Sequence, residues 1–112
     1  DAGDNVLIAL ANRLRDAVRT DDMVCRLGGD EFLLICPNTG LENALALGES
    51  LREQVSALRV TNGDGCWSGS VSIGVASRTD AMKNYESLIK EADESVYLAK
   101  NAGKNCVRSA QA

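Results

Sequence analysis

The segment RLGGDEF at residues 26–32 places two carboxylates, Asp30 and Glu31, directly after two glycines. Adjacent carboxylates repel each other and suit a hard divalent cation such as Mg²⁺, which prefers oxygen ligands. Glycines allow backbone N–H groups to approach a ligand because no β-carbon stands in the way. Together these are parts of a phosphoryl or nucleotidyl transfer site, in which a metal bridges phosphate oxygens and neutralises developing charge.

Apolar runs at residues 23–25 and 33–36 flank this segment and predict a β-hairpin. Gly28 and Gly29 supply the positive φ angles that tight hairpin turns require. For an arbitrary hairpin, the default interpretation is that the two acids are simply solvated at the tip. That interpretation leaves the adjacent carboxylates unexplained, so we favour a catalytic turn.

Hydrophobic periodicity predicts the elements around the hairpin. A first helix is expected to start near Asp4 or Asn5, either of which is a good N-cap. A second helix carries a continuous apolar stripe over residues 41–58, and residues 62–65 read as a turn or loop. Alternation over residues 70–75 predicts a half-buried strand, in which Gly74 indicates a bulge or a close contact.

The last helix is expected to end near Gly103 in a left-handed cap and to lead into a short segment around residues 106–107. Its inward-facing residues are expected to be Tyr85, Leu88, Ile89, Ala92, Val96 and Leu98 or Ala99. Helices and strands mix without a strict β-α-β rhythm. The sequence therefore predicts an α+β fold with a mainly antiparallel central sheet flanked by helices.

The composition describes one globular domain, since 45% of the 112 residues are hydrophobic and 25% are charged. A formal net charge of -4 argues against nucleic acid as a partner, because phosphate-backbone binding needs a clustered excess of lysine and arginine. The four cysteines form no C-x-x-C pair and the chain has no histidine, which removes the usual zinc patterns. No apolar run is long enough to cross a bilayer, so we expect a cytoplasmic domain whose parent protein could be membrane-tethered.

The signature RLGGDEF resembles that of the GGDEF family, the diguanylate cyclase domains that join two GTP molecules into cyclic di-GMP. Residues 3–7 resemble the family's G-D-x-x-L helix start, residues 70–76 its S-x-G-I/V-A strand, and residues 92–105 its last helix with the A-K-x-x-G-[RK]-N ending. Several motifs in the right order are far more specific than one pentapeptide. The resemblance covers residues 1–112 and implies a palm-like sheet flanked by helices, as in nucleotide cyclases.

For the signature, the resemblance implies a catalytic role in both carboxylates. Asp30 would be a metal ligand and the candidate base for the attacking 3′-hydroxyl, and Glu31 its acidic neighbour in metal and substrate handling. Gly28 and Gly29 would contact phosphate. The implied cofactor is Mg²⁺ or Mn²⁺, and the implied reaction needs a homodimer in which each copy holds one GTP.

Three further residues match substrate-binding positions of the family. Asp4 falls where the family contacts the guanine base, although a helix N-cap is an equally good interpretation. Lys100 and Lys104 match positions that reach the triphosphate, but they are also ordinary cations at a helix C-terminus, where the helix dipole favours them. Lys104 replaces the commoner arginine, which keeps the charge and loses the bidentate fork.

Arg19-Thr20-Asp21-Asp22 would ordinarily be a solvated charged turn. Family members regulated by product carry R-x-x-D at this distance before the signature, where it resembles a clamp for the guanine and phosphate of cyclic di-GMP. The resemblance therefore implies an inhibitory site at Arg19 and Asp22, with Arg26 as a further participant.

The chain begins inside the family's G-H-x-x-G-D segment, so it is expected to lack the N-terminal strand and helix of a GGDEF domain. In the family that part holds a further metal-binding Asp, a Lys and a guanine-reading Asn. We expect the 112-residue chain alone to be inactive and the parent protein to carry an upstream sensory or receiver domain. Three functions stay open: a cyclase domain, a non-catalytic domain that binds cyclic di-GMP or GTP, and a fragment with a structural role.

Overall fold

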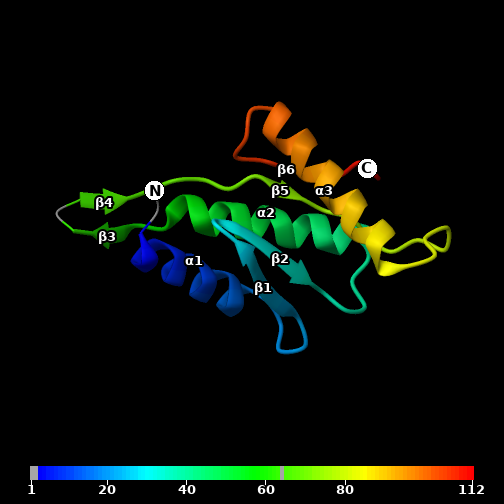
Figure 1. Ribbon diagram of the computed structural model, residues 1–112, viewed down its shortest axis with the longest axis horizontal. Helices are drawn as coiled ribbons and strands as arrows, with labels where there is room; N and C mark the ends of the chain where they lie inside the picture. Colours follow the sequence, from blue (N-terminus) through cyan, green and yellow to red (C-terminus); the bar gives the residue numbers. More distant parts are fainter. Residues whose placement is uncertain (1–2, 64) are drawn as a thin grey trace. The chain divides into compact units, whose positions relative to one another are not determined.

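Three helices and six strands make up residues 3–63 and 65–112, the part of the chain that the computed structural model describes (Figure 1). The helices are α1 (Asp4–Ala17), α2 (Leu41–Ala57) and α3 (Tyr85–Asn101). The strands are β1 (Met23–Gly28), β2 (Glu31–Ile35), β3 (Val60–Asn62), β4 (Gly65–Trp67), β5 (Ile73–Gly74) and β6 (Val107–Arg108). They belong to two compact units, which we describe separately: one comprises residues up to Asn38 with Gln54–Gly69, the other Thr39–Glu53 with Ser70–Ala112.

In the first unit, α1 begins at Asp4 and contributes the buried side chains of Val6 and Leu14. The expectation that Asp4 or Asn5 caps this helix is wrong. Gly3 is the N-cap, in extended backbone and without a side-chain cap, and its carbonyl accepts from the N–H of Val6 at 3.0 Å. Asp4 instead lies in the first turn, where a negative charge interacts favourably with the helix dipole.

The predicted hairpin is confirmed as the antiparallel pair β1–β2. Its register runs from Met23 opposite Ile35 to Arg26 opposite Phe32, and then shifts so that Gly28 lies opposite Glu31. The shift leaves Leu27 as an extra residue in β1, a β-bulge that the alternation of the sequence does not reveal.

A second antiparallel hairpin, β3–β4, completes the strands of this unit. The segment expected as a turn or loop, residues 62–65, includes one residue of each strand, and Asp64 lies outside the described residues. Each strand is three residues long, which is too short for an alternating pattern to identify.

In the second unit, β5 pairs with β6 in parallel. The expected strand over residues 70–75 is only Ile73–Gly74, because its partner β6 is itself two residues long. The close contact expected at Gly74 is confirmed: a β-carbon placed there would lie 2.6 Å from the carbonyl oxygen of Ala92 and 2.7 Å from the carbonyl carbon of Ser95. The absence of a side chain at Gly74 thus lets β5 lie against the backbone of α3.

The inward face of α3 differs in part from the expected one. Tyr85 is 73% exposed, and Ile89 and Leu98 are also exposed, whereas Ser95 and Ala99 are fully buried. Small residues occupy this face because α3 approaches the β5 backbone too closely for large side chains. Of the two alternatives for the inward-facing residue at this position, Leu98 and Ala99, it is Ala99 that is buried.

The end of α3 confirms the predicted left-handed cap. Gly103 has a φ of 113°, and its N–H donates to the carbonyl of Lys100 at 3.4 Å. The next N–H, that of Lys104, donates to the carbonyl of Ala99 at 3.0 Å. This pair of bonds is a Schellman motif, which satisfies carbonyls that the helix end would leave without partners.

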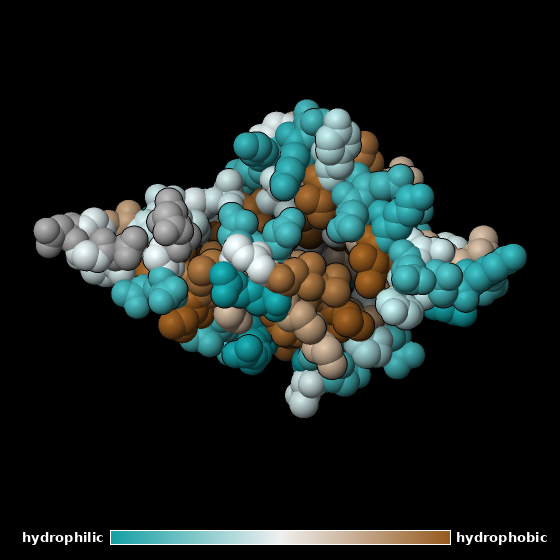
Figure 2. All heavy atoms as spheres, viewed as in Figure 1, coloured by the Kyte–Doolittle hydropathy of each residue, from teal (hydrophilic) through white to brown (hydrophobic). Residues whose placement is uncertain are grey.

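The α+β fold class is confirmed, and two of the three strand pairs in the described residues are antiparallel. The strands pair as three two-stranded sheets, and not as the one sheet expected. Figure 2 shows both hydrophilic and apolar residues on the face it draws. Ile8 and Leu27 are among the exposed apolar residues. None of the described helices is both long enough and apolar enough to cross a membrane.

Candidate active site at the glycine turn

The turn between β1 and β2 presents the two carboxylates to solvent. Gly28 ends β1 with a φ of 152°, and Gly29 follows with a φ of 53°. Asp30 is the second turn residue and Glu31 begins β2, and all four residues are exposed. A β-carbon placed on either glycine would meet no atom within 4 Å, so the space beside the turn is open to a ligand.

Arg26 holds this turn in shape. Its Nε and one terminal nitrogen donate to the carbonyl oxygen of Gly29 at 2.9 and 2.6 Å. The guanidinium is thus directed into the turn, which gives no support to Arg26 as a participant in the inhibitory site. The sequence analysis did not predict that Arg26 supports the turn. The available signal was an arginine, with its fork of N–H donors, three positions before Gly29, whose carbonyl lies in the turn.

The residues of the turn fit a Mg²⁺ ion as a partial ligand set. Mg²⁺ is commonly bound by one or two carboxylates, with substrate phosphates and water completing the shell. Asp30 and Glu31 are two exposed carboxylates of that kind. Within the described residues no group of three or more acidic, histidine or cysteine side chains could hold a metal. Asp30 and Glu31 can therefore supply two oxygen ligands of such an ion.

The other expected substrate residues lie on other elements. Asp4 is exposed in the first turn of α1, in the same unit as the glycine turn. Lys100 and Lys104 belong to the second unit, the former in the last turn of α3 and the latter just after Gly103. Both lysines are exposed, and in residues 3–63 and 65–112 neither forms an ion pair. Their ammonium groups are accordingly available to an anion.

The expected inhibitory pair, Arg19 and Asp22, does come together. The backbone N–H of Arg19 donates to Oδ2 of Asp22 at 2.9 Å, and the N–H of Asp22 donates to the carbonyl of Arg19 at 3.0 Å. The guanidinium lies 3.7 Å from the same Oδ2 and donates to the carbonyl of Pro37 at 3.1 Å. The Arg19 side chain is 61% exposed and that of Asp22 only 2%, so Asp22 orients the turn while Arg19 faces solvent.

A hollow of about 390 Å³ lies beside this pair. Its lining residues are Arg15, Val18, Arg19, Thr20, Asp22, Met23 and Val24. Arg15 therefore brings a second guanidinium to the hollow. The R-x-x-D pattern does not include Arg15, and helical spacing does not identify it either, because α1 ends at Ala17 and Arg19 lies beyond it.

Two further details concern the surroundings of Arg19 and Asp22. Oδ1 of Asp22 is buried and has no hydrogen-bond partner among the described atoms. Burial raises the pKa of the nearby Cys36 thiol, the negative charge of Asp22 raises it further, and Arg19 opposes them. All four cysteines are free thiols. The Cys36 thiol thus stays protonated at neutral pH.

Comparison with known proteins shows which family the sequence belongs to. The sequence matches the family described as diguanylate cyclase, GGDEF domain, over residues 1–106. The chain belongs to the GGDEF family. Among similar proteins, the response regulator PleD of Caulobacter vibrioides is 42% identical over 109 residues, which cover 96% of this chain and 24% of PleD.

Two further relatives agree with this assignment. The diguanylate cyclase DgcM of Escherichia coli is 41% identical over 108 residues, covering 96% of this chain and 25% of DgcM. The solved GGDEF domain of YfiN, also called TpbB, from Pseudomonas aeruginosa matches with a TM-score of 0.82 and 32% identity, over 96% of this chain and 67% of that one. This GGDEF chain spans about a quarter of the length of the curated relatives it matches.

Proposed function

We propose that the protein containing this GGDEF domain is a diguanylate cyclase that condenses two GTP molecules into cyclic di-GMP and releases pyrophosphate. The observation that carries the proposal is the open glycine turn, which exposes Asp30 and Glu31 beside backbone that a ligand can approach. A relative that is 41% identical is named a diguanylate cyclase, which supports the same activity.

In this proposal the exposed residues of the glycine turn divide the contacts with phosphate, proton and metal ion among them. The backbone N–H groups of Gly28 and Gly29 contact phosphate, and Asp30 accepts the proton of the attacking 3′-hydroxyl. Glu31 shares the handling of metal and substrate. When bound, Mg²⁺ or Mn²⁺ supplies positive charge at the phosphate oxygens, and Asp30 and Glu31 would hold it.

The remaining tasks concern binding. Asp4 accepts hydrogen bonds from the guanine base, and Lys100 and Lys104 neutralise the triphosphate. Guanine offers N–H donors on its ring edge, which a carboxylate can accept. Two ammonium groups without ion pairs in the described residues suit a triphosphate because neither must first leave a partner.

The reaction requires two copies because each holds one GTP. The 3′-hydroxyl oxygen of each GTP forms a bond to the α-phosphorus of the other, and the bond from that phosphorus to pyrophosphate breaks, so that two phosphodiester bonds form and two pyrophosphates leave. The dimer supplies the orientation of hydroxyl and phosphate, which accounts for a large part of the acceleration in such reactions.

The test uses the intact protein and its production of cyclic di-GMP from GTP. Asp30→Asn and Glu31→Gln should each abolish turnover while circular dichroism stays unchanged. Asp16→Asn is the matched control, since Asp16 is an exposed carboxylate in the same unit, on α1. Full turnover by a folded Asp30→Asn or Glu31→Gln variant would refute the proposal.

Product inhibition at the hollow beside Arg19 is the second part of the proposal. Arg19 faces solvent, is oriented by Asp22, and shares the hollow with Arg15. Arginine forks suit cyclic di-GMP because guanine presents O6 and N7 as paired acceptors and each phosphate accepts bidentate bonds. A bound product that bridges two domains would hold their active turns apart.

Calorimetric titration of cyclic di-GMP into the intact protein tests this site. Charge-assisted hydrogen bonds contribute about 1.5 to 3 kcal/mol each, so Arg19→Ala should weaken binding by at least about tenfold. Arg13→Ala is the matched control, because Arg13 is an exposed arginine of α1 that does not line the hollow. Equal affinities of the wild type and Arg19→Ala would mean that the pair is only a solvated turn.

The two tests also separate the alternative function. A non-catalytic binding domain would show binding that depends on Arg19 and no turnover in the wild type. An upstream receiver domain is proposed as the regulatory partner, and the similarity to PleD, a response regulator, supports it.

A further inference from the structure

The backbone around Lys104 has a conformation that its residue types do not favour. Lys104 and Asn105 have φ values of 64° and 47°, directly after Gly103. Residues other than glycine rarely occupy this left-handed region, and they remain there when surrounding structure holds them. Asparagine tolerates it better than lysine does.

The Schellman motif accounts only for the first of these three residues. It needs one left-handed residue, which is Gly103, and its second bond ends at the N–H of Lys104. Lys104 and Asn105 continue in the left-handed region beyond the motif. A contact from outside the loop is therefore needed to hold them.

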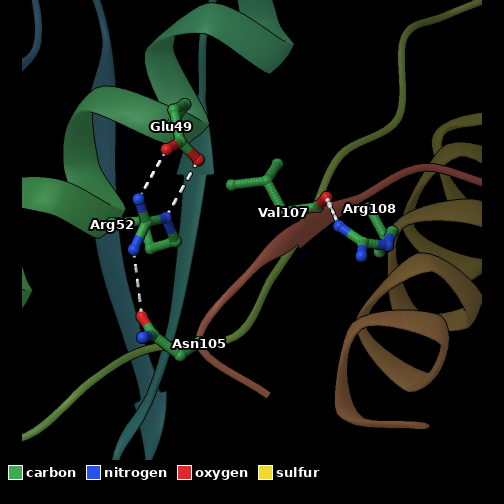
Figure 3. Close-up of polar contacts among 5 residues, drawn as sticks. All are labelled: Glu49, Arg52, Asn105, Val107 and Arg108. Carbon is green, nitrogen blue, oxygen red and sulfur yellow. Dashed lines mark hydrogen bonds and ion pairs between the residues drawn. The ribbon is translucent and has the colours of Figure 1, made fainter. Parts of the chain in front are cut away.

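Arg52 of α2 makes that contact. Its Nε and one terminal nitrogen donate to the two carboxylate oxygens of Glu49 at 2.9 and 2.5 Å, and its other terminal nitrogen donates to Oδ1 of Asn105 at 3.2 Å (Figure 3). The Arg52 side chain is only 21% exposed. Glu49, one turn earlier in the helix, thus fixes the guanidinium so that one arm is directed at the loop.

The chain that follows the loop also contacts α2, at Gly48. A β-carbon placed on Gly48 would lie 3.0 Å from Cγ1 of Val107, so α2 approaches β6 closely at this point. Gly48 and Arg52 are four residues apart and share one side of α2. The helix therefore contacts the chain at Asn105 and again at Val107, immediately after Lys104.

We propose that Arg52 is the positioning residue for Lys104: by holding Asn105, it fixes the left-handed backbone that presents the Lys104 ammonium to a triphosphate. This inference rests on the proposed function, in which Lys104 binds that triphosphate. Arg52 itself does not touch the nucleotide, because its three donating nitrogens are directed to Glu49 and Asn105.

The experiment measures KM for GTP and kcat with the intact protein. Lys104→Ala should raise KM by about tenfold, the effect of one charge-assisted hydrogen bond. Arg52→Ala should raise KM by about three- to tenfold with a smaller change in kcat, because it displaces Lys104 without removing it. Arg108→Ala is the control, since that guanidinium donates to the carbonyl of the neighbouring Val107 on β6 (Figure 3) and should leave KM unchanged.

Coupling between the variants distinguishes positioning from general stability. The double variant Arg52→Ala/Lys104→Ala should have the KM of Lys104→Ala alone, since nothing is left to position. Asn105→Gly removes the acceptor but allows positive φ, so adding Arg52→Ala to it should change KM no further. Arg52→Lys keeps one donor and should recover part of the loss, which also provides a readout if Arg52→Ala does not fold.

Each failure has a separate meaning. An unchanged KM in Lys104→Ala would overturn both this inference and the triphosphate role of Lys104, while leaving the test of Asp30 and Glu31 intact. A raised KM in Lys104→Ala with an unchanged KM in Arg52→Ala and Arg52→Lys would overturn this inference alone. Additive effects of Arg52→Ala and Lys104→Ala would do the same, because they would show that Arg52 acts elsewhere.

Discussion

The glycine turn at Gly28–Gly29 and the loop at Lys104–Asn105 both place backbone in positive-φ conformations next to side chains proposed to bind nucleotide. In the turn, the residue type supplies the conformation, because glycine adopts positive φ without steric cost. In the loop, Lys104 and Asn105 adopt positive φ beyond the Schellman motif of Gly103, and the hydrogen bond from Arg52 to Asn105 holds them there.

The two regions differ in how far along the sequence the residues lie that stabilise each conformation. The turn depends on four consecutive residues and on the fork of Arg26, all within one short segment. The loop depends on Arg52 of α2, which lies 53 positions before Asn105 in the sequence. A local pattern can therefore reveal the turn, whereas the loop becomes understandable only once the helix is seen to hold it.

The largest expected effect is the loss of stability when a closely packed glycine, Gly74, is replaced by alanine. Gly74→Ala should destabilise the domain by about 3 kcal/mol, because its β-carbon would press on the backbone of α3, which cannot move aside as a side chain could. Urea denaturation followed by circular dichroism measures this. Gly40→Ala is the control, since a β-carbon there meets nothing within 4 Å and no positive φ is involved. A Gly74→Ala variant as stable as Gly40→Ala would mean that β5 does not lie against α3 as described.

A smaller effect is expected at the turn itself. Gly29→Ala introduces no clash, so its cost is the left-handed backbone alone, about 1 to 2 kcal/mol. Gly29→Asn should cost less, because asparagine tolerates this region. The same denaturation measurement applies to both variants. Equal losses for alanine and asparagine would contradict a purely conformational cost and indicate steric contact at the turn.

The sequence predicted the elements with long periodic patterns and strong end signals. The stripe over residues 41–58 predicted α2, the apolar runs around Gly28 and Gly29 predicted β1–β2, and Gly103 predicted the end of α3. The wrong expectations depended on neighbours that are distant in sequence. Tyr85 and Ile89 follow the helical period, but the approach of β5 at Gly74 selects the face with small residues.

The candidate site was predicted to a similar extent. Asp30 and Glu31 were placed correctly at an exposed turn, and Arg19 and Asp22 do come together. The residues that support them were missed. Arg26 on the Gly29 carbonyl and Arg52 on Asn105 act through side-chain hydrogen bonds to groups whose position is known only after folding. Arg52 belongs to none of the motifs, so the sequence carries no signal of its contact with Asn105.

Acid should weaken the support of the loop and leave that of the turn intact. The hydrogen bond from Arg52 lowers the pKa of Glu49 below its ordinary 4.5, so the pair stabilises the folded state above that pH. The contribution is lost as pH falls through the lowered pKa. Unfolding midpoints of wild type and Glu49→Gln should therefore differ slightly at pH 7 and converge as the pH falls below the lowered pKa of Glu49. A difference that persists unchanged in acid would show that the charge of Glu49 does not support the loop.

The smallest expected effect tests whether contacts alone hold the loop. Lys104→Gly relieves the left-handed strain but also adds freedom to the unfolded chain, and these terms nearly cancel, so the free energy of unfolding should change by less than about 1 kcal/mol. Lys104→Ala keeps the strain, and the glycine variant should be more stable than the alanine variant by about 1 kcal/mol. At position 29, the wild type should likewise have a larger free energy of unfolding than Gly29→Ala, by a similar amount. Both pairs compare glycine with alanine at a residue whose φ is near 60°. If Lys104→Gly and Lys104→Ala were equally stable in urea denaturation, the loop would leave the left-handed region in solution, and the support by Arg52 would have no strained conformation to hold.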